Sequence, residues 1–365
     1  MSNTTKNNLS YFAQLDGIRC FAVISVIIGH WVAWDTENII LKNTPWGHGV
    51  ILFFVLSGYL ISNILFESKE KILINQISFI HSLKIFYTRR FLRIFPAYYM
   101  LLFYLFYINH ANTREIFPWL MTFSSNILQC KTGNYIGDFN HFWSLAVEEQ
   151  FYILWPFVIL LSNQKHVFKI ILAFLALAFL SRSISFFVFK DNWMISSYFT
   201  LNQFFPLCLG AFLAYVKRYN LYWKKIFENK IAWFIALLSY SGFFYLAKYN
   251  LNSSFLFGIF DEYLFSIVCA FIIYKASGNG FRFLIGYLLH HEIVVFIGKI
   301  SYGLYLYHLF VIGFFWNYIS PNFGVSISDK HMVWLLYFIT LFLITLLSYY
   351  FIEKPANSLK RFFKY

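Results

Sequence analysis

Stretches of about 20 apolar residues recur along the whole chain and are separated by short polar segments. A helix of about that length crosses the hydrocarbon core of a bilayer. The stretch 116–129 is apolar but shorter, so we expect a re-entrant or interfacial segment there rather than a full crossing. The pattern predicts ten membrane-spanning helices, over residues 12–34, 48–66, 92–109, 142–162, 168–189, 199–216, 231–247, 255–275, 293–316 and 332–352.

The positions of lysine and arginine test this topology. If the N-terminus lies in the cytoplasm and the ten spans alternate, 20 of the 29 basic residues fall on the cytoplasmic side and six on the outer side. Such a bias is typical of cytoplasmic loops. A full crossing by 116–129 would place the later loops on the opposite sides of the membrane and largely cancel this charge bias. We therefore predict an all-α polytopic membrane helix bundle of about ten transmembrane helices with both termini cytoplasmic. The other three basic residues lie inside spans: Arg19, Arg182 and Lys299.

Composition supports a membrane protein of one domain, residues 1–365. The chain is 59% hydrophobic and 12% charged, whereas soluble domains carry about 25% charged residues. The net charge of +13 follows from the basic cytoplasmic loops, so we expect no nucleic-acid partner. The N-terminal residues lack the basic and small-residue features of a cleavable signal peptide. The cysteines are scattered without a CxxC pair, so neither a disulfide framework nor a metal site is expected.

The first predicted span, LDGIRCFAVISVIIGHW, carries ionisable residues that are costly in lipid. Asp16 and Arg19 are three residues apart and can pair on one helix face. Arg19 and His30 are eleven residues apart, so they share a face and are separated by about 16 Å along the axis. This arrangement suits a ligand with a cytosolic anionic end and a deeper reactive end. The alternative is a structural histidine that bonds to a neighbouring carbonyl.

Arginines also crowd the cytoplasmic start of the third predicted span. The segment YTRRFLRIFPAYY contains Arg89, Arg90 and Arg93. Guanidinium forks bind phosphate groups through two hydrogen bonds. The cluster therefore fits a phosphate-bearing ligand, and the alternative is an anchor for lipid headgroups.

The segment HFWSLAVEEQFYILWP places Ser144, Glu148 and Tyr152 four residues apart on one helix face. A carboxylate inside a span can act as a general acid or base, and we assign this role to Glu148. For Glu149 we expect a buried ion pair with an arginine of a neighbouring helix.

A second polar stripe lies in ISYGLYLYHLF, where Ser301, Tyr305 and His308 fall at i, i+4 and i+7. As a stripe, these residues are expected to line a cavity. Asp261 and Glu262 lie beside an outer loop; we expect them to be exposed and assign them no role.

In this order, the clusters resemble the acyltransferase-3 family of bacterial integral-membrane O-acyltransferases. The resemblance covers nearly the whole chain. Many relatives carry a fused hydrolase-like domain, and we expect this chain to be the membrane domain alone. The matching segments are LDGIRCFAVISVIIGHW (15–31), GVILFFVLSGYLIS (49–62), RRFLRIFPAYY (89–99), HFWSLAVEEQFYILWP (141–156), ISYGLYLYH (300–308) and FIEKP (351–355).

The resemblance implies which residues carry the reaction. The family's arginine–histidine motif falls on Arg19 and His30, and its arginine pair falls on Arg90 and Arg93. His30 would be a general base or a transient acyl carrier, assisted by Glu148 and Arg19, while Arg90, Arg93 and Arg19 would hold the donor. No metal is expected. The residues expected to contact substrate are Asp16, Trp143, Ser144, Tyr152, Tyr305 and His308.

The implied activity is transfer of an acyl group from cytosolic acyl-CoA to a hydroxyl of a cell-envelope glycan, such as O-antigen or exopolysaccharide. Acetyl-CoA is the donor that the family favours, and the location is the bacterial cytoplasmic (inner) membrane. Two alternatives stay open. One is a secondary transporter, which also places charges in spans; the other is an acyltransferase acting on a lipid or on peptidoglycan.

Overall fold

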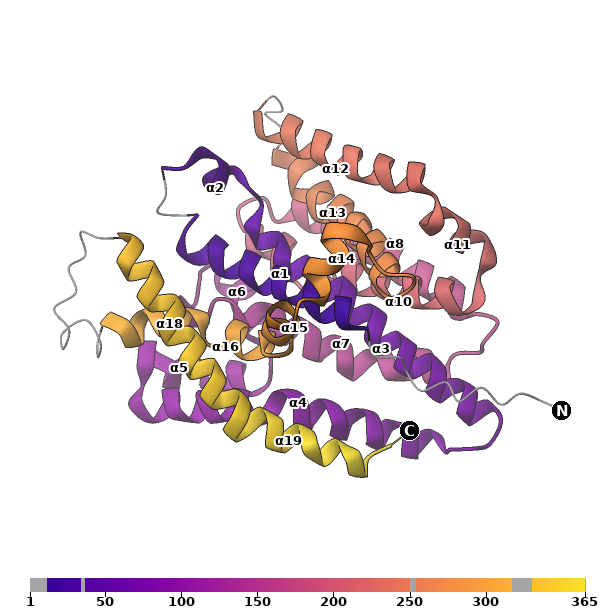
Figure 1. Cartoon of the computed structure of the whole chain (residues 1–365), viewed down its shortest axis with the longest axis horizontal. Coiled ribbons are helices and arrows are strands. Elements are labelled where there is room, and N and C mark those ends of the chain that lie inside the picture. Colours follow the sequence, from indigo (N-terminus) through magenta and orange to yellow (C-terminus); the bar gives the residue numbers. More distant parts are fainter. Residues whose placement is uncertain (1–11, 34–36, 250–253, 317–329, 365) are drawn as a thin grey trace.

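The computed structural model describes residues 12–33, 37–249, 254–316 and 330–364, and this part of the chain is helical without strands (Figure 1). The longer helices are α1 (Ala13–Trp31), α3 (Gly49–Leu73), α4 (Phe79–Ile108), α7 (Phe142–Leu161), α8 (Val167–Val188), α10 (Phe204–Tyr219), α12 (Lys230–Tyr249), α13 (Ser254–Ala276), α16 (Ser301–Phe314) and α18 (Lys330–Ser348).

Shorter helices connect or extend these elements: α2 (Ile39–Asn43), η1 (Trp46–His48), η2 (His110–Asn112), α5 (Thr113–Met121), α6 (Ser125–Thr132), η3 (Gly137–Phe139), α9 (Trp193–Tyr198), α11 (Leu221–Glu228), α14 (Phe283–His290), α15 (Glu292–Lys299), the π-helical turn η5 (Tyr349–Glu353), α19 (Lys354–Ser358) and η6 (Leu359–Phe362).

Six helices in the described residues are long and apolar enough to cross a membrane: Ala13–Trp31, Trp46–Leu73, Phe79–Ile108, Phe142–Leu161, Val167–Val188 and His331–Phe362. The pair α15 and α16 is bent by 68° and makes a seventh if it is one span. Helix α10 has only 16 residues, which rise about 24 Å against a hydrocarbon core of about 30 Å. The multi-pass helical class is confirmed, while the number ten and the cytoplasmic location of the termini stay predictions. Lys6 and the last residue of the first predicted span, residue 34, lie outside the described residues.

The segment 116–129 does not form one long helix. It is divided between α5 and α6, which have nine and eight residues. Phe123 separates them with a positive φ of 50°, a conformation that no helix continues through. Neither helix is long enough to cross the bilayer, in agreement with the expectation from sequence.

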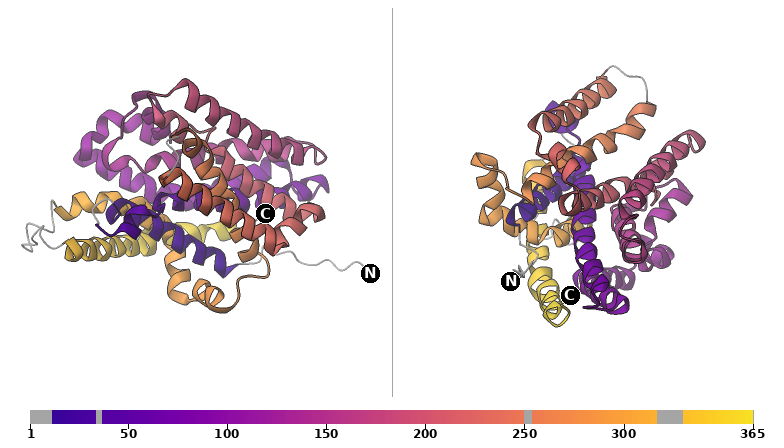
Figure 2. Two further views of the ribbon diagram at one scale, coloured as in Figure 1. Left: turned by 90° about the horizontal axis from the view of Figure 1, so that it is seen from above. Right: turned by 90° about the vertical axis from the view of Figure 1, so that its right-hand side faces the viewer.

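Helix α3 packs against four other long helices, α1, α7, α10 and α13, within the bundle that Figure 2 shows from two further sides. Its closest neighbour is α10, because two glycines let the backbones meet. A Cβ atom at Gly58 would lie 1.9 Å from the Leu207 carbonyl oxygen, and one at Gly210 would lie 2.1 Å from the Val55 carbonyl oxygen. Small residues at such crossings permit the close packing that holds helices together in lipid.

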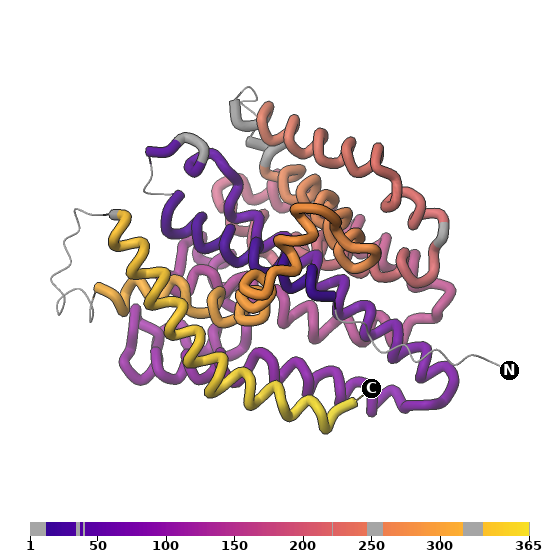
Figure 3. The backbone as a smooth tube through the Cα atoms, in the orientation of Figure 1, coloured from indigo at the N-terminus to yellow at the C-terminus, as the bar shows by residue number. Residues whose placement is uncertain are grey.

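Hydrogen bonds tie several helix ends together at one end of the bundle. Arg218 of α10 forms a two-pronged ion pair with Glu70 near the end of α3. Arg89 of α4 donates to the carbonyl oxygen of Phe363, at 2.7 Å. The start of α1, the start of α4 and the end of η6 lie toward this same side (Figure 3). The two described ends of the chain therefore share one end of the bundle.

The expectation that Asp261 and Glu262 are exposed is wrong. Asp261 is 6% exposed and its Oδ2 atom lies 2.8 Å from Nε2 of His48. Glu262 pairs with Arg182 of α8 and accepts a hydrogen bond from Gln203, at 3.1 Å. Because α13 begins at Ser254, both residues lie within the helix, where lipid cannot solvate a charge and a partner is required.

The contact between α3 and α10 leads to a test of the packing. We expect Gly58→Ala to destabilise the protein by about 1–3 kcal/mol, because the new methyl group overlaps the Leu207 carbonyl. Gly242→Ala in α12 is the matched control, since a Cβ there meets nothing within 4 Å. Thermal unfolding in detergent measures both. Equal midpoints for the two variants would contradict this account of the α3–α10 contact.

Candidate active site

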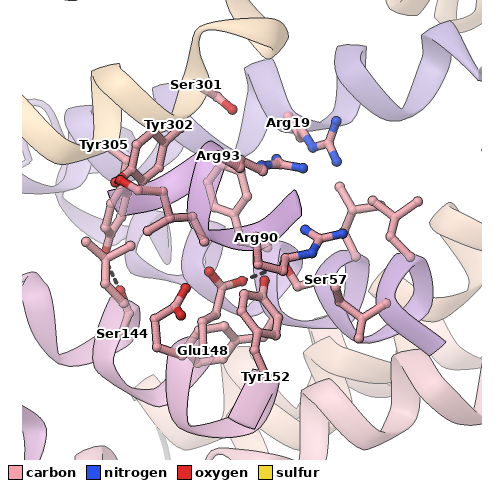
Figure 4. Close-up of a pocket in the computed structure, with 18 of the residues that line it drawn as sticks. Arg19, Ser57, Arg90, Arg93, Ser144, Glu148, Tyr152, Ser301, Tyr302 and Tyr305 are labelled. Atoms are coloured by element: carbon pink, nitrogen blue, oxygen red, sulfur yellow. Dashed lines mark hydrogen bonds between the residues drawn. The ribbon is translucent and has the colours of Figure 1, made fainter. Parts of the chain in front are cut away.

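Five helices surround a cavity that collects most of the polar residues expected to act together. Helices α1, α3, α4, α7 and α16 supply its walls, and α16 contributes Ser301, Tyr302 and Tyr305 (Figure 4). The polar lining residues are Arg19, Ser57, Arg90, Arg93, Ser144, Glu148, Glu149, Tyr152, Ser301, Tyr302 and Tyr305. We call this cavity the arginine pocket.

Three arginines give the pocket its name. Arg90 and Arg93 lie almost one turn apart on α4, and Arg19 reaches the same space from α1 (Figure 4). Arg19 pairs with Asp16, as its spacing predicted. Arg90 lies over the ring of Tyr152, 5.6 Å from its centroid. An aromatic face favours a cation and holds the guanidinium flat, so Arg90 is oriented by the pocket wall.

Two neighbouring carboxylates of α7 face the arginines. Glu148 accepts a hydrogen bond of 2.5 Å from Ser57 of α3. Glu149 is 7% exposed, and its Oε1 atom has no hydrogen-bond partner. The expected ion pair for Glu149 is not among the ion pairs of the described residues, although Arg90 interacts with its charge. Twelve buried side-chain polar atoms of the described residues lack a hydrogen-bond partner, and the Glu149 atom is the one whose residue lines the arginine pocket, so a ligand bound there can donate to it.

Ser144 and Tyr305 close the pocket on the side of α16. Their hydroxyl oxygens are 2.5 Å apart, and each lies 3.1 Å from the carbonyl oxygen of His141. The hydroxyl of Tyr302 donates to the Ile94 carbonyl of α4, at 2.8 Å. These bonds hold α16 against α7 and α4 beside the arginines.

Beyond Tyr305 lies a cluster of three histidines. Nε2 of His308 is 3.1 Å from Nδ1 of His30, and Nδ1 of His308 is 2.7 Å from the carbonyl oxygen of Tyr305. The ring of His141 lies 4.7 Å from that of His308 and its Nε2 bonds to the Leu306 carbonyl, at 3.1 Å. In the described part of the chain, no three His, Cys, Asp or Glu side chains are arranged to hold a metal ion.

The structure divides the predicted residues between two adjoining places. Seven of them line the arginine pocket: Arg19, Arg90, Arg93, Ser144, Glu148, Tyr152 and Tyr305. His30 and His308 lie in the histidine cluster instead, so the two motif residues of α1 face different parts of the site. Asp16 and Trp143 do not line the pocket; the Trp143 ring stacks on that of Tyr198, with centroids 4.6 Å apart.

Sequence reasoning assigned no role to several residues of this region. Ser57 and His141 lie in segments that carried the family resemblance, but only their contacts with Glu148 and His308 mark them as part of the site. Tyr302 directly follows Ser301, the first residue of the polar stripe that includes Tyr305. The sequence signal that could have marked these residues as part of the site is that they are polar residues in otherwise apolar motif segments.

Comparison with known proteins gives the family of the chain. The family model described as "Acyltransferase domain" matches residues 12–353. A Staphylococcus aureus (strain COL) protein named "Putative O-acetyltransferase" is 30% identical, over 97% of this chain and 59% of its own length. "Peptidoglycan O-acetyltransferase OatA" of Listeria monocytogenes serovar 1/2a is 29% identical, over 100% of this chain and 59% of its own.

"O-acetyltransferase OatA" of Staphylococcus aureus (strain NCTC 8325 / PS 47) is 30% identical, over 95% of this chain and 57% of its own length. The chain thus spans less than two thirds of the length of these relatives. No solved structure matches it. The family match covers both the arginine pocket and the histidine cluster, and the chain belongs to the acyltransferase-3 family.

Proposed function

We propose that this protein transfers an acyl group, acetyl in the first instance, from cytosolic acyl-CoA to a hydroxyl of a cell-envelope glycan. One observation carries the proposal: a pocket of three arginines adjoins a cluster of histidines, and Tyr305 lines the pocket while its carbonyl oxygen contacts His308. The arginines suit a polyanionic donor, and the histidines suit proton transfer. A transporter has no need of this combination, and the family of the chain is one of acyltransferases.

The donor would enter from the side that carries most of the basic loops, which we take as the cytoplasm. Arg90, Arg93 and Arg19 would hold its phosphates through charge-assisted hydrogen bonds. The pantetheine arm of acyl-CoA contains amide N–H groups. The unpartnered Oε1 of Glu149 could accept one of them and satisfy its own hydrogen-bonding capacity. The thioester would then lie toward Tyr305 and the histidine cluster.

His30 would act on the acyl transfer in one of two ways. As a general base, it takes the proton of the acceptor hydroxyl while the oxygen bonds to the thioester carbon. The C–S bond breaks, and the proton passes to the leaving thiolate. As an acyl carrier, a ring nitrogen of His30 first bonds to the thioester carbon and displaces the thiolate. The acceptor oxygen then bonds to the acyl carbon and displaces the imidazole. The proton of the acceptor hydroxyl ends on the released thiolate.

The acceptor is proposed to be a saccharide hydroxyl on the outer side of the cytoplasmic membrane. Among acceptors, peptidoglycan is a specific second candidate beside O-antigen or exopolysaccharide, because a relative of similar sequence carries peptidoglycan in its name. Mass spectrometry of envelope glycans from a deletion strain and its parent tests the proposal. The expected result is the loss of one acetyl increment from one glycan class; unchanged acylation of every class would refute it.

Binding of the donor depends on the arginines of α4. We expect Arg90→Ala/Arg93→Ala to weaken acyl-CoA binding by about 10-fold or more, since each lost charge-assisted hydrogen bond contributes about 1.5–3 kcal/mol. Titration of purified protein with acetyl-CoA measures the change. Arg282→Ala is the control, because Arg282 is exposed and lies outside the pocket. Equal affinity in the double variant and the wild type would exclude the arginine pocket as the donor site.

Transfer itself depends on His30. We expect His30→Ala to lower the rate of acyl transfer in membranes by about 10²–10⁴-fold, the usual contribution of a general base. Acetyl-CoA affinity should be retained, because His30 does not line the arginine pocket. His166→Ala replaces an exposed histidine and should leave the rate unchanged. Normal transfer by His30→Ala would remove His30 from the mechanism.

A further inference from the structure

The hydrogen bonds of His308 determine which of its nitrogens carries a proton. Its Nδ1 atom lies 2.7 Å from the carbonyl oxygen of Tyr305. A carbonyl oxygen can only accept, so Nδ1 must be the donor. A neutral imidazole has one N–H group, and Nε2 of His308 is therefore an acceptor.

His308 is held in this neutral form by its surroundings. The residue has 0% exposure, and its ring packs against those of His141 and Tyr305, with centroids 4.7 and 5.5 Å away. An imidazolium among these groups would be a desolvated charge without a counter-charge, which is costly. The main chain is also fixed, because Nε1 of Trp31 donates to the His308 carbonyl oxygen at 3.2 Å.

The proton of His30 follows from that of His308. Nε2 of His308 lies 3.1 Å from Nδ1 of His30. Since the His308 nitrogen accepts, Nδ1 of His30 carries the hydrogen; the Val26 carbonyl beside the His30 ring is a second acceptor. In neutral His30, Nε2 is then left with a free lone pair.

We propose that His308 is a positioning residue that fixes the tautomer and the ring orientation of His30, leaving Nε2 of His30 as the reactive nitrogen. This inference rests on the proposed function of His30. It reassigns His308, which the sequence placed among the substrate contacts. Both ring nitrogens of His308 are occupied by protein partners, so neither is available to a substrate.

The arrangement performs the task that a buried carboxylate has in serine hydrolases, where an acceptor on one imidazole nitrogen makes the other nitrogen basic. Here the acceptor is a second, neutral imidazole whose own proton is held by a backbone carbonyl. A neutral acceptor adds no negative charge to the membrane interior, where an unpaired carboxylate would be costly. Both possible roles of His30, base and acyl carrier, require a lone pair on Nε2.

Two substitutions separate positioning from packing. His308→Gln keeps an acceptor oxygen near the former Nε2 atom, whereas His308→Leu retains bulk and removes the acceptor. We expect His308→Leu to lower kcat of acyl transfer by about 10–100-fold, the range seen when a metal-binding histidine loses the partner that orients its ring, with little change in KM for acetyl-CoA. His308→Gln should recover most of kcat. Equal losses of kcat in the two variants would count against the proposal.

The tautomer is also measured directly in the wild-type protein. Nitrogen-15 NMR of histidine-labelled protein distinguishes Nδ1–H from Nε2–H rings, and the signals of His30 among the ten histidines are those missing in His30→Ala. The proposal requires the Nδ1–H form for His30; the Nε2–H form would overturn it. This readout is independent of catalysis. If His30→Ala is active, the proposed role of His30 fails whatever the tautomer, although acyl transfer itself stands; if His30→Ala is inactive but His30 is Nε2–H, only the role of His308 fails.

Discussion

Lipid cannot solvate a polar group, and this constraint organises the protein. Every charge carried into the bundle interior needs a partner from the protein itself. Arg19 finds Asp16 on its own helix, and Arg182 finds Glu262 across a helix interface. With those charges paired, the polar groups that stay without a protein partner are informative. The unpartnered oxygen of Glu149 lies in the arginine pocket, and it is there that a polar ligand would be accommodated.

The close packing of the bundle serves the same site. Helices α3 and α10 meet through glycines, and α3 in turn contacts α1 and α7. Ser57 on α3 is thereby brought against Glu148 on α7, at 2.5 Å. The position of this carboxylate therefore depends on a helix contact at the neighbouring Gly58. Loosening that contact is expected to affect chemistry as well as stability.

Helix α1 connects the two halves of the site. Arg19 reaches the arginine pocket from one part of this helix, while His30 joins the histidine cluster near its end. The rise of eleven residues separates them by about 16 Å. Tyr305 lies between the halves: its side chain lines the pocket and its carbonyl oxygen holds His308. A donor that spans both halves would have its anionic part and its reactive part held by one rigid helix.

Local spacing in the sequence was sufficient for features that lie within one helix. The apolar stretches predicted a multi-pass helical bundle, the i, i+3 spacing predicted the Asp16–Arg19 pair, and the four-residue spacing placed Ser144, Glu148 and Tyr152 on one face. These features depend only on the pitch of an α-helix and on the thickness of a bilayer.

Contacts between distant segments were decided by the tertiary structure. It paired His48 with Asp261 and Arg182 with Glu262, left Oε1 of Glu149 without a hydrogen-bond partner among the described residues, and joined His30 to His308 across 278 positions of the chain. Helical periodicity indicates which face a residue lies on, but not which helix packs against that face. The partner of each buried polar group, and with it the reactive nitrogen of His30, depends on helix packing that only the folded chain determines.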